Sequence, residues 1–407
     1  RLSSSTATSG DTLAYSYDLF DRMTSLVATE GNGTGSTTVS VGYDGLDRIT
    51  SLQTPSATNT YTFDDFARTK ATTVNFGPFS KTYVYNVDAQ GRKTGLTLPD
   101  GTEIAYAYEA DGDLSTLTVA GDKVVSYANP DAVTRVVTMP PVTMTRTRNA
   151  MGVMQSIAAV NTADETVMDW TYSTNAWRID SITASEGVTT FTYDADEKIL
   201  GATYPSLPAT TLTYDVAGNR TTDSRRPGQA WSYDAANRLT AIGTEGSFAW
   251  DADGNMLVRF LDGATWTLTW DAQNQLTQVE DGGGVVATYG YDGRGRRVRK
   301  TVAGVSTFYL YSDEGLLAEY DASGTELAAY GWQPNTGWQS TPTFMRVGSA
   351  YYWTLTDHQG VPAKLVDDSG TVVWRLERDA FGQSQASGSV TYNLRQSSQY
   401  FDAETGL

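Results

Sequence analysis

Hydrophobic residues recur along this chain in pairs separated by one residue, and most pairs are followed at once by Asp or Asn and a turn. The second residues of the later pairs, at positions 193, 214, 233, 250, 270, 291 and 311, are aromatic and lie 17 to 21 residues apart. A period of about 20 residues is too short for most helical repeats and fits one β-hairpin. The clearest copies are Tyr15 and Tyr17 before Asp18, Tyr61 and Phe63 before Asp64, Tyr83 and Tyr85 before Asn86, Phe191 and Tyr193 before Asp194, Leu212 and Tyr214 before Asp215, Trp231 and Tyr233 before Asp234, Phe248 and Trp250 before Asp251, Leu268 and Trp270 before Asp271, and Tyr289 and Tyr291 before Asp292.

The turn after each pair has its own chemistry. An Asp at the first position and a Gly at the fourth are typical of a type I turn that ends in a left-handed residue. Asn237 and Asn274 replace this Gly in two copies, and Asn tolerates the left-handed conformation best among the other residues. We assign to the structural repeat Tyr17, Asp18, Tyr43, Asp44, Tyr193, Asp194, Tyr214, Asp215, Gly218, Tyr233, Asp234, Trp250, Asp251, Gly254, Trp270, Asp271, Tyr291, Asp292 and Gly295.

Each turn leads into a strand in which every second residue is aliphatic or β-branched, as in residues 48–52 and 238–242. Residues two apart on a strand share one face, so we expect Trp250, Trp270 and Tyr291 to stack on one another along the sheet. The copies weaken between about residues 120 and 180, which we interpret as degenerate repeats and not as a linker.

The number of hairpins determines the architecture. About 18 hairpins, with two strands each and about 4.8 Å between strands, make a sheet roughly 170 Å wide, which cannot stay open without curling. Closed into one ring it would be roughly 55 Å across, too wide for side chains to fill. We therefore predict an all-β fold in which a long, curled antiparallel sheet forms a hollow shell or a spiral.

Charge and composition narrow the partners. The 407 residues include 29 Lys and Arg against 47 Asp and Glu, a net charge of −18, which argues against nucleic acid or an anionic membrane as a partner. The chain has no cysteine, so disulfides and thiolate chemistry are excluded. No apolar run approaches the roughly 18 residues of a membrane span, and residues 1–5 lack the apolar segment of a signal peptide.

Other residue types give weak signals for chemistry. His358 is the only histidine and sits second in the turn from Asp357 to Gly360, so a turn or packing role is preferred over catalysis. The basic run 294–300 overlaps a repeat turn, and we expect a solvated edge or pairing with neighbouring acids. The repeated Asp residues lack the spacing of a calcium loop, and the Gly-rich residues 281–284 lack the Lys of a phosphate loop. We predict no cofactor and no metal.

Taken together, these repeats resemble the bacterial RHS and YD-repeat family, whose relatives include the toxin-complex C subunits and the animal teneurins. The C-terminal part adds to the resemblance. Residues 351–360 are similar to the family's D-H-x-G segment, residues 367–382 to the strands that follow it, and residues 393–395 and 399–407 to the start of its core signature. We therefore predict a repeat shell over residues 1–350 and the start of the core over residues 351–407. In the family this core runs on to a D-P-x-G-x self-cleavage site, so we expect the chain to be a piece of a longer protein.

The resemblance also implies a function. It implies a structural, non-enzymatic cocoon that encloses a C-terminal toxin domain, belongs to an exported or cell-surface protein, and has that toxin, the remaining shell and a secretion-system component as partners. It further implies that Arg395 and Asp402 assist self-cleavage. An adhesion or recognition scaffold of the teneurin type is the alternative function, and an enzyme is the third, for which the sequence gives no catalytic cleft.

The repeat interpretation predicts mainly β-structure in solution. Far-UV circular dichroism of the purified chain should show a β-type spectrum with little helix. A helical content above about 20% would contradict the hairpin repeat.

Overall fold

The computed structural model of the chain describes residues 2–31, 33, 35–396 and 399–407, and its regular structure is entirely β. These residues form 37 strands and no α-helix. Within each of two sheets every strand pairs antiparallel with the next strand in the sequence, so each sheet is a continuous meander. The predicted all-β fold of a long, curled antiparallel sheet is confirmed.

The two sheets divide the chain between residues 223 and 231. The first sheet contains β1 Ser4–Thr6, β2 Thr12–Tyr17, β3 Met23–Thr29, β4 Ser36–Tyr43, β5 Ile49–Gln53, β6 Thr58–Phe63, β7 Thr69–Asn75, β8 Ser80–Val87, β9 Lys93–Thr97, β10 Glu103–Tyr108, β11 Leu114–Val119, β12 Lys123–Ala128, β13 Thr134–Met139, β14 Val142–Arg148, β15 Met154–Asn161, β16 Thr166–Asn175, β17 Arg178–Ala184, β18 Gly187–Tyr193, β19 Ile199–Thr203, β20 Thr210–Tyr214 and β21 Arg220–Asp223. The second contains β22 Trp231–Tyr233, β23 Leu239–Ile242, β24 Gly246–Trp250, β25 Met256–Leu261, β26 Ala264–Trp270, β27 Leu276–Asp281, β28 Gly284–Tyr291, β29 Arg297–Val302, β30 Val305–Tyr311, β31 Leu316–Tyr320, β32 Glu326–Trp332, β33 Pro342–Val347, β34 Ala350–Thr356, β35 Pro362–Asp367, β36 Val372–Arg378 and β37 Ser384–Gly388.

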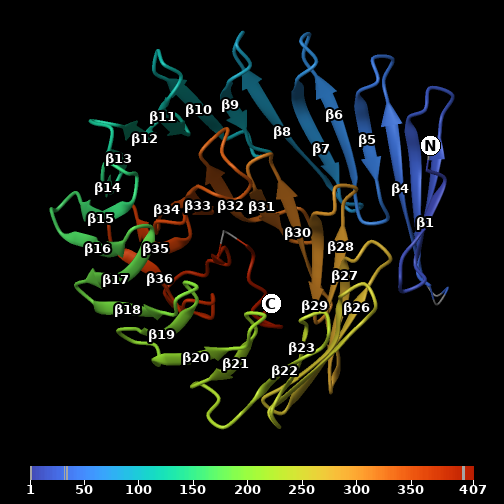
Figure 1. Cartoon of the computed structure of the whole chain (residues 1–407). Coiled ribbons are helices and arrows are strands. Elements are labelled where there is room, and N and C mark those ends of the chain that lie inside the picture. The colour runs from blue at the N-terminus through green and yellow to red at the C-terminus, as the bar shows by residue number, and fades with distance from the viewer. Residues whose placement is uncertain (1, 32, 34, 397–398) are drawn as a thin grey trace.

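The sheets wind into a spiral of more than one turn (Figure 1). The first sheet forms the outer turn, and the second sheet continues this turn and then passes inside it. Hydrogen bonds join the turns along the arc: Thr54 donates to the carbonyl of Tyr291 at 2.7 Å, and Lys364 donates to the carbonyl of Val167 at 2.8 Å. The spiral solves the problem posed by the sheet's width, because the second turn fills space that a single ring would leave empty.

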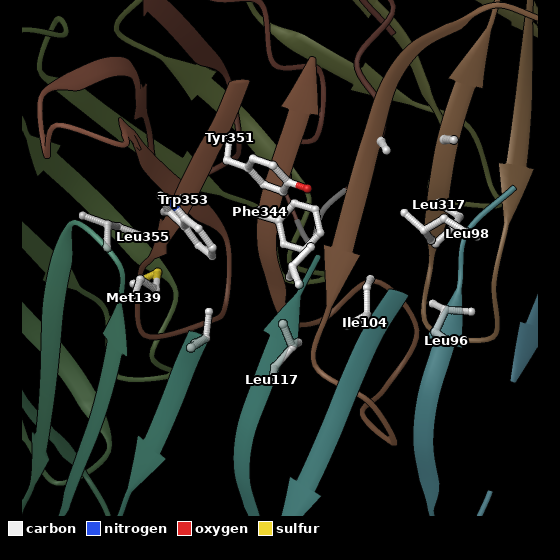
Figure 2. Close-up of a cluster of buried hydrophobic side chains, with 14 of the residues drawn as sticks. Leu96, Leu98, Ile104, Leu117, Met139, Leu317, Phe344, Tyr351, Trp353 and Leu355 are labelled. Carbon is white, nitrogen blue, oxygen red and sulfur yellow. The ribbon is translucent and has the colours of Figure 1, made fainter. Parts of the chain in front are cut away.

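An apolar layer holds the two turns together (Figure 2). Ile104 and Leu117 from the outer turn are buried in one cluster with Phe344, Trp353 and Leu355 from the inner turn. Along outer strands such as β10, exposed and buried residues alternate, whereas all five residues of the inner strand β31 are buried. The outer turn therefore has one solvated face, and the inner turn is covered on both faces over part of its length.

Many hairpins contain a bulge at the second aromatic position of the repeat, and in at least ten of them the ring there carries a hydrogen-bond donor. The register shifts beside this residue, as between Thr213 and Tyr214. Its hydroxyl or indole N–H then donates to a backbone carbonyl at the start of the preceding hairpin's second strand, so Tyr and Trp are equivalent here and Phe is not. The donors and carbonyls are Tyr43 to Met23, Tyr108 to Lys93, Tyr193 to Ile179, Tyr214 to Ile199, Tyr233 to Arg220, Trp250 to Leu239, Trp270 to Met256, Tyr291 to Leu276, Tyr311 to Arg297 and Trp332 to Leu316, at 2.6 to 3.0 Å.

The repeat Asp closes the turn through its carboxylate. Asp215 accepts hydrogen bonds from the backbone N–H groups of Ala217 at 2.9 Å and Asn219 at 2.8 Å. Gly218, the fourth residue of the turn, has a φ of 85°, as a type I turn followed by a left-handed residue requires. The predicted turn mechanism is confirmed in this copy, and elsewhere the structure also places Asp21, Asp47, Ala67 and Glu197 in the left-handed position.

Two expectations about the repeat were wrong in detail. Trp250, Trp270 and Tyr291 make no ring contact with one another, although Trp270 and Tyr291 pack against the same buried cluster. In the first hairpins an arginine from the preceding turn lies beside the repeat ring, as Arg22 does at 4.7 Å from the ring centre of Tyr43. The copy assigned to Tyr83, Tyr85 and Asn86 turns two residues later, from Asp88 to Gly91.

The bulge hydrogen bond predicts opposite effects for two substitutions. Tyr214→Phe removes the donor to the Ile199 carbonyl and should lower the free energy of unfolding by about 1 kcal/mol. Phe63 occupies the same place in its hairpin but has no hydroxyl, so Phe63→Tyr should supply a donor to the Ile49 carbonyl and raise the stability by a similar amount. Urea unfolding of both variants measures the changes.

Tyr15→Phe is the matched control, because the Tyr15 hydroxyl has no hydrogen-bond partner among the described residues. Equal shifts in the Tyr214 and Tyr15 variants would show that the bulge hydrogen bond contributes nothing to stability.

Candidate functional site

The C-terminal segment after β37 lies inside the inner turn and is the best candidate for a functional site. Figure 1 shows the C-terminus near the middle of the spiral. Tyr392 and Leu394 are fully buried in an apolar cluster with Tyr330 and Trp374 of the inner turn. Regular pairing in this segment is limited to one bridge between Leu394 and Tyr400. Side-chain contacts with the inner turn therefore hold the segment in place.

A buried ion-pair cluster anchors the end of this segment. Asp402 is only 3% exposed and lies between two cations of β29, Arg297 and Lys300. The Nζ atom of Lys300 is 2.8 Å from Asp402 and 2.9 Å from Glu404, and Arg297 binds both oxygens of the Asp402 carboxylate. Burial lowers the pKa of Arg297, but the charge and the hydrogen bond of Asp402 together with Tyr309 and Tyr311 outweigh burial, so this pKa is raised overall.

A second buried carboxylate lies beside this cluster. Glu319 on β31 accepts hydrogen bonds from the hydroxyls of Tyr330 at 2.5 Å and Tyr400 at 3.0 Å. Burial raises the pKa of Glu319, and the two tyrosine hydroxyls and nearby cations only partly offset this effect. Asn393 donates in turn to the Tyr400 hydroxyl at 2.8 Å. Glu319 therefore links the wall of the shell to the C-terminal segment through a polar chain.

Of the two residues that the resemblance suggested for self-cleavage, only Asp402 belongs to this cluster. Arg395 donates to the Ser384 hydroxyl at 3.2 Å and lies 3.9 Å from the ring centre of Phe401. The cations paired with Asp402 come from the basic run 294–300, for which pairing with acids was one of the two expected roles. Sequence reasoning missed Arg297, Lys300 and Glu319 as members of the site, and the role of Arg395 and Asp402 in cleavage stays a prediction.

His358 occupies the turn where the sequence placed it. Its ring contacts the Tyr172 ring of the outer turn at 5.2 Å between centres, and burial lowers its pKa. Asp357 beside it accepts hydrogen bonds from backbone N–H groups at 2.8 and 3.0 Å, as the repeat Asp does elsewhere.

Among the described residues no group of three His, Asp or Glu side chains is placed to hold a metal ion. No helix among them could span a membrane either.

The spiral keeps open space where its wall is a single layer. A cavity of about 1010 Å³ lies between the inner face of β22 to β25 and the turn after β36. Trp231, Ile242, Phe248 and Leu261 line its apolar side. A smaller cavity of about 310 Å³ lies where the outer strands β16 to β19 separate from the inner strands β35 and β36. The predicted hollow is therefore present, but the inner turn and the C-terminal segment fill much of the interior.

The Asp402 cluster predicts that one substitution frees the C-terminal segment. Asp402→Asn leaves the buried Arg297 without its counter-ion and Lys300 with Glu404 alone, which should cost about 3 to 5 kcal/mol and make residues 389–407 sensitive to limited proteolysis. Asp368→Asn is the control, since its pair with Lys123 is half exposed and contributes little. Equal cleavage of the two variants would contradict the anchoring role.

Glu319 predicts a dependence on pH. Because its pKa is raised in the folded state, the protonated form stabilises the fold below the ordinary pKa of Glu, and this stability is lost as the pH rises through the raised value. Glu319→Gln has no carboxyl group to ionise at this place. The free energy of unfolding of this variant minus that of the native chain, measured in urea, should therefore increase from pH 4 to pH 8. A Glu103→Gln control on the exposed surface should show no such trend.

Comparison with curated proteins gives partial matches to large toxins. The tRNA nuclease WapA of Bacillus subtilis is 33% identical over 184 residues, which are 43% of this chain and 8% of WapA. The double-stranded DNA deaminase toxin A of Burkholderia cenocepacia is 28% identical over 227 residues, 47% of this chain and 16% of that protein. The chain thus spans less than a fifth of the length of these relatives.

Solved structures match nearly the whole chain in fold. The crystal structure of TcdB2-TccC3-Cdc42 has a TM-score of 0.78 at 14% identity over 97% of this chain and 24% of the matched chain. The Tc holotoxin pore of Photorhabdus luminescens gives 0.78 and 14% over 98% of this chain and 24% of its own. At 14% identity the structural likeness establishes the fold alone. The sequence establishes the family, because the Teneurin YD-shell family model matches residues 166–407. The chain therefore belongs to the YD-shell family of RHS and YD-repeat proteins.

Proposed function

We propose that this chain is a section of the wall of a shell that encloses a polypeptide toxin. The observation that supports this most is the place of the C-terminus: the segment ending at Leu407 is anchored inside the inner turn by Asp402. A domain joined to Leu407 would begin in the interior of the spiral. The likeness to the Tc toxin shell supports the same function.

The cavity behind β22 to β25 is too small to hold a folded toxin domain. A folded domain of 100 residues has a radius of gyration near 13 Å, which corresponds to a sphere of roughly 20,000 Å³. The cavity of about 1010 Å³ is roughly twentyfold smaller. The chain therefore acts as a wall section together with further shell, in keeping with its 24% share of the Tc chains.

The relatives support a structural role for this section. WapA is named for cleaving tRNA and the Burkholderia protein for deaminating DNA, yet both share sequence with this chain. Because the matches cover only 8% and 16% of two proteins named for different activities, we assign neither activity to this chain. We accordingly propose no catalytic activity for the wall itself. We propose that the whole protein is an exported effector and that its partners are the enclosed toxin, the remaining shell and a secretion-system component.

The division into a repeat shell, residues 1–350, and the start of the core, residues 351–407, belongs to this proposal, as does assistance by Arg395 and Asp402 in releasing the toxin.

Limited proteolysis of the full-length protein tests enclosure. Gly218 and Gly254 have φ values of 85° and 94°, which a β-branched residue rarely adopts, so Gly218→Val with Gly254→Val should strain two hairpins of the wall. The domain after the shell should resist a folded protease in the native protein and be cut several-fold faster in this variant.

Gly45→Val is the matched control, because Gly45 lies in the same kind of turn with ordinary φ and open space around it. Rapid cutting of the following domain in the native protein, with no slower phase than in the strained variant, would reject enclosure and favour an adhesion scaffold of the teneurin type.

A further inference from the structure

The wall has one interruption in its strand pairing among the described residues. From β1 to β21 and from β22 to β37 each strand is hydrogen-bonded to the next, but β21 and β22 are not paired. Residues 224–230 connect these two strands. Side-chain contacts hold the wall together between β21 and β22, whereas backbone hydrogen bonds join the other neighbouring strands among the described residues. We call the junction between β21 and β22 the seam.

The seam has two rims, one beside the repeat turns and one at the opposite ends of the strands. Partly exposed contacts bridge the seam at both rims. On the rim of the repeat turns, Asn219 donates to the side chain of Asn237 at 2.9 Å, and the Tyr233 hydroxyl donates to the Arg220 carbonyl. On the opposite rim, Arg226 binds Asp262 at 2.6 Å and Glu245 at 3.0 Å. The Asp262 side chain is 63% exposed, so the pair with Arg226 contributes little and weakens with salt.

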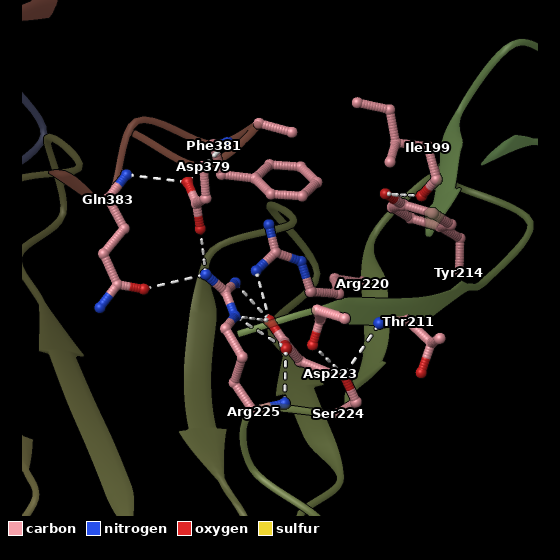
Figure 3. A network of polar contacts seen from close by, with 12 residues as sticks. Ile199, Thr211, Tyr214, Arg220, Asp223, Ser224, Arg225, Asp379, Phe381 and Gln383 are labelled. Atoms are coloured by element: carbon pink, nitrogen blue, oxygen red, sulfur yellow. Dashed lines mark hydrogen bonds and ion pairs between the residues drawn. The ribbon is translucent and has the colours of Figure 1, made fainter. Parts of the chain in front are cut away.

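Inside the wall two arginines hold the seam (Figure 3). Arg220 of β21 pairs with Asp223 at 3.0 Å and lies 4.9 Å from the ring centre of Trp231 on β22. Arg225 binds the carboxylate of Asp223 at the end of β21, at 2.5 Å, and also the carboxylate of Asp379 in the turn between β36 and β37. Both carboxylates are almost completely buried. Arg225 therefore ties three parts of the molecule together: the connecting segment, the last strand of the first sheet and the inner turn.

The Asp379 turn differs from most repeat turns in a way that makes this tie possible. In the turns beginning at Asp18, Asp44 and Asp64, an arginine four residues later neutralises the Asp. In the Asp379 turn that position is Gln383, which instead accepts a hydrogen bond from Arg225 at 2.9 Å. The carboxylate of Asp379 is thus left for a partner from the outer turn.

We propose that the seam is a gate in the wall, with Arg225 as its latch. Two observations carry this inference: the absence of strand pairing between β21 and β22, and the cavity of about 1010 Å³ directly behind them, lined by Arg225, Trp231 and Asp379. When the latch releases, the two sheets separate along the seam without breaking a backbone ladder, and the mouth of the cavity widens. Passage of an enclosed polypeptide through this gate rests on the proposed function, but the opening itself does not.

Two pairs of nitroxide labels test the gate in the chain alone. The chain has no cysteine, so Asn219→Cys with Asn237→Cys places labels on either side of the seam. Asn255→Cys with Asn274→Cys is the matched control, because the same Asn–Asn contact, at 2.8 Å, there spans β25 and β26, which are paired. Dipolar broadening of the electron paramagnetic resonance spectrum reports whether the two labels of a pair remain close.

Both pairs should be strongly broadened with the latch intact. With Arg225→Gln, the separated fraction of the seam pair should rise roughly tenfold or more, since a buried charge loses its partner, while the control pair stays broadened. Asp379→Asn is a milder second variant that removes only the inner-turn anchor and should act in the same direction. Equal behaviour of the two label pairs in both variants, whether both stay broadened or both lose broadening, would overturn the gate.

This result is independent of the proteolysis test. A seam that opens in a protein whose following domain is never protected would leave the gate standing and reject enclosure. A following domain that is protected from the protease while the seam never opens would support enclosure and reject the gate.

Discussion

The hydrogen bond from a Tyr or Trp ring at a β-bulge to the preceding hairpin, repeated along the chain, is the interaction on which the rest of this structure depends. A bulge bends its strand and increases the local twist, and here bulges recur at the same end of successive hairpins, as at Tyr43, Tyr214 and Tyr291. Because the bends accumulate in one direction, the sheet curls. The donor on the ring fixes each bend against its neighbour, as in the bond from Tyr214 to the Ile199 carbonyl. Curling brings the second turn inside the first, and this in turn creates the apolar layer and carries the C-terminus to the interior.

The two turns are consequently stabilised in different ways. The outer turn keeps a solvated face and gains its stability from hairpin to hairpin, as an array of repeats does. The inner turn is covered by the outer turn on one side and by the C-terminal segment on the other, so its strands bury both faces, including the charged residues Glu319 and Lys300. Between these zones the wall at β21 to β25 is a single layer with a cavity behind it. The open space and the seam therefore occur together where the wall is a single layer.

What the sequence could predict follows from the distance over which each interaction acts. The Asp215 turn and its left-handed Gly218 involve four consecutive residues, so residue types alone specified them. The Arg–aromatic alternation, as between Arg22 and Tyr43, involves neighbouring hairpins and was misjudged as ring stacking, because the guanidinium competes for the same surface. The pairing of Asp402 with Lys300 joins residues about 100 positions apart through the winding of the spiral. No local pattern contains that information, although the basic run and the acidic segment were both visible.

Hairpins that depart from the repeat sequence make contacts that the other hairpins do not make. Where Arg or Lys stands four residues after the repeat Asp, as Arg48 does after Asp44, the carboxylate is neutralised within its own hairpin. Where that cation is replaced, the carboxylate has several fates, and in some turns an Asn in its place donates a hydrogen bond, as Asn219 does to Asp215. Asp271, followed by Gln275, has no cation, and burial raises its pKa. Asp379, followed by Gln383, takes Arg225 from the outer turn and so joins the two sheets. A single change at one position of the repeat thus converts a local turn into a tertiary contact, which is how an array of similar hairpins acquires a unique seam.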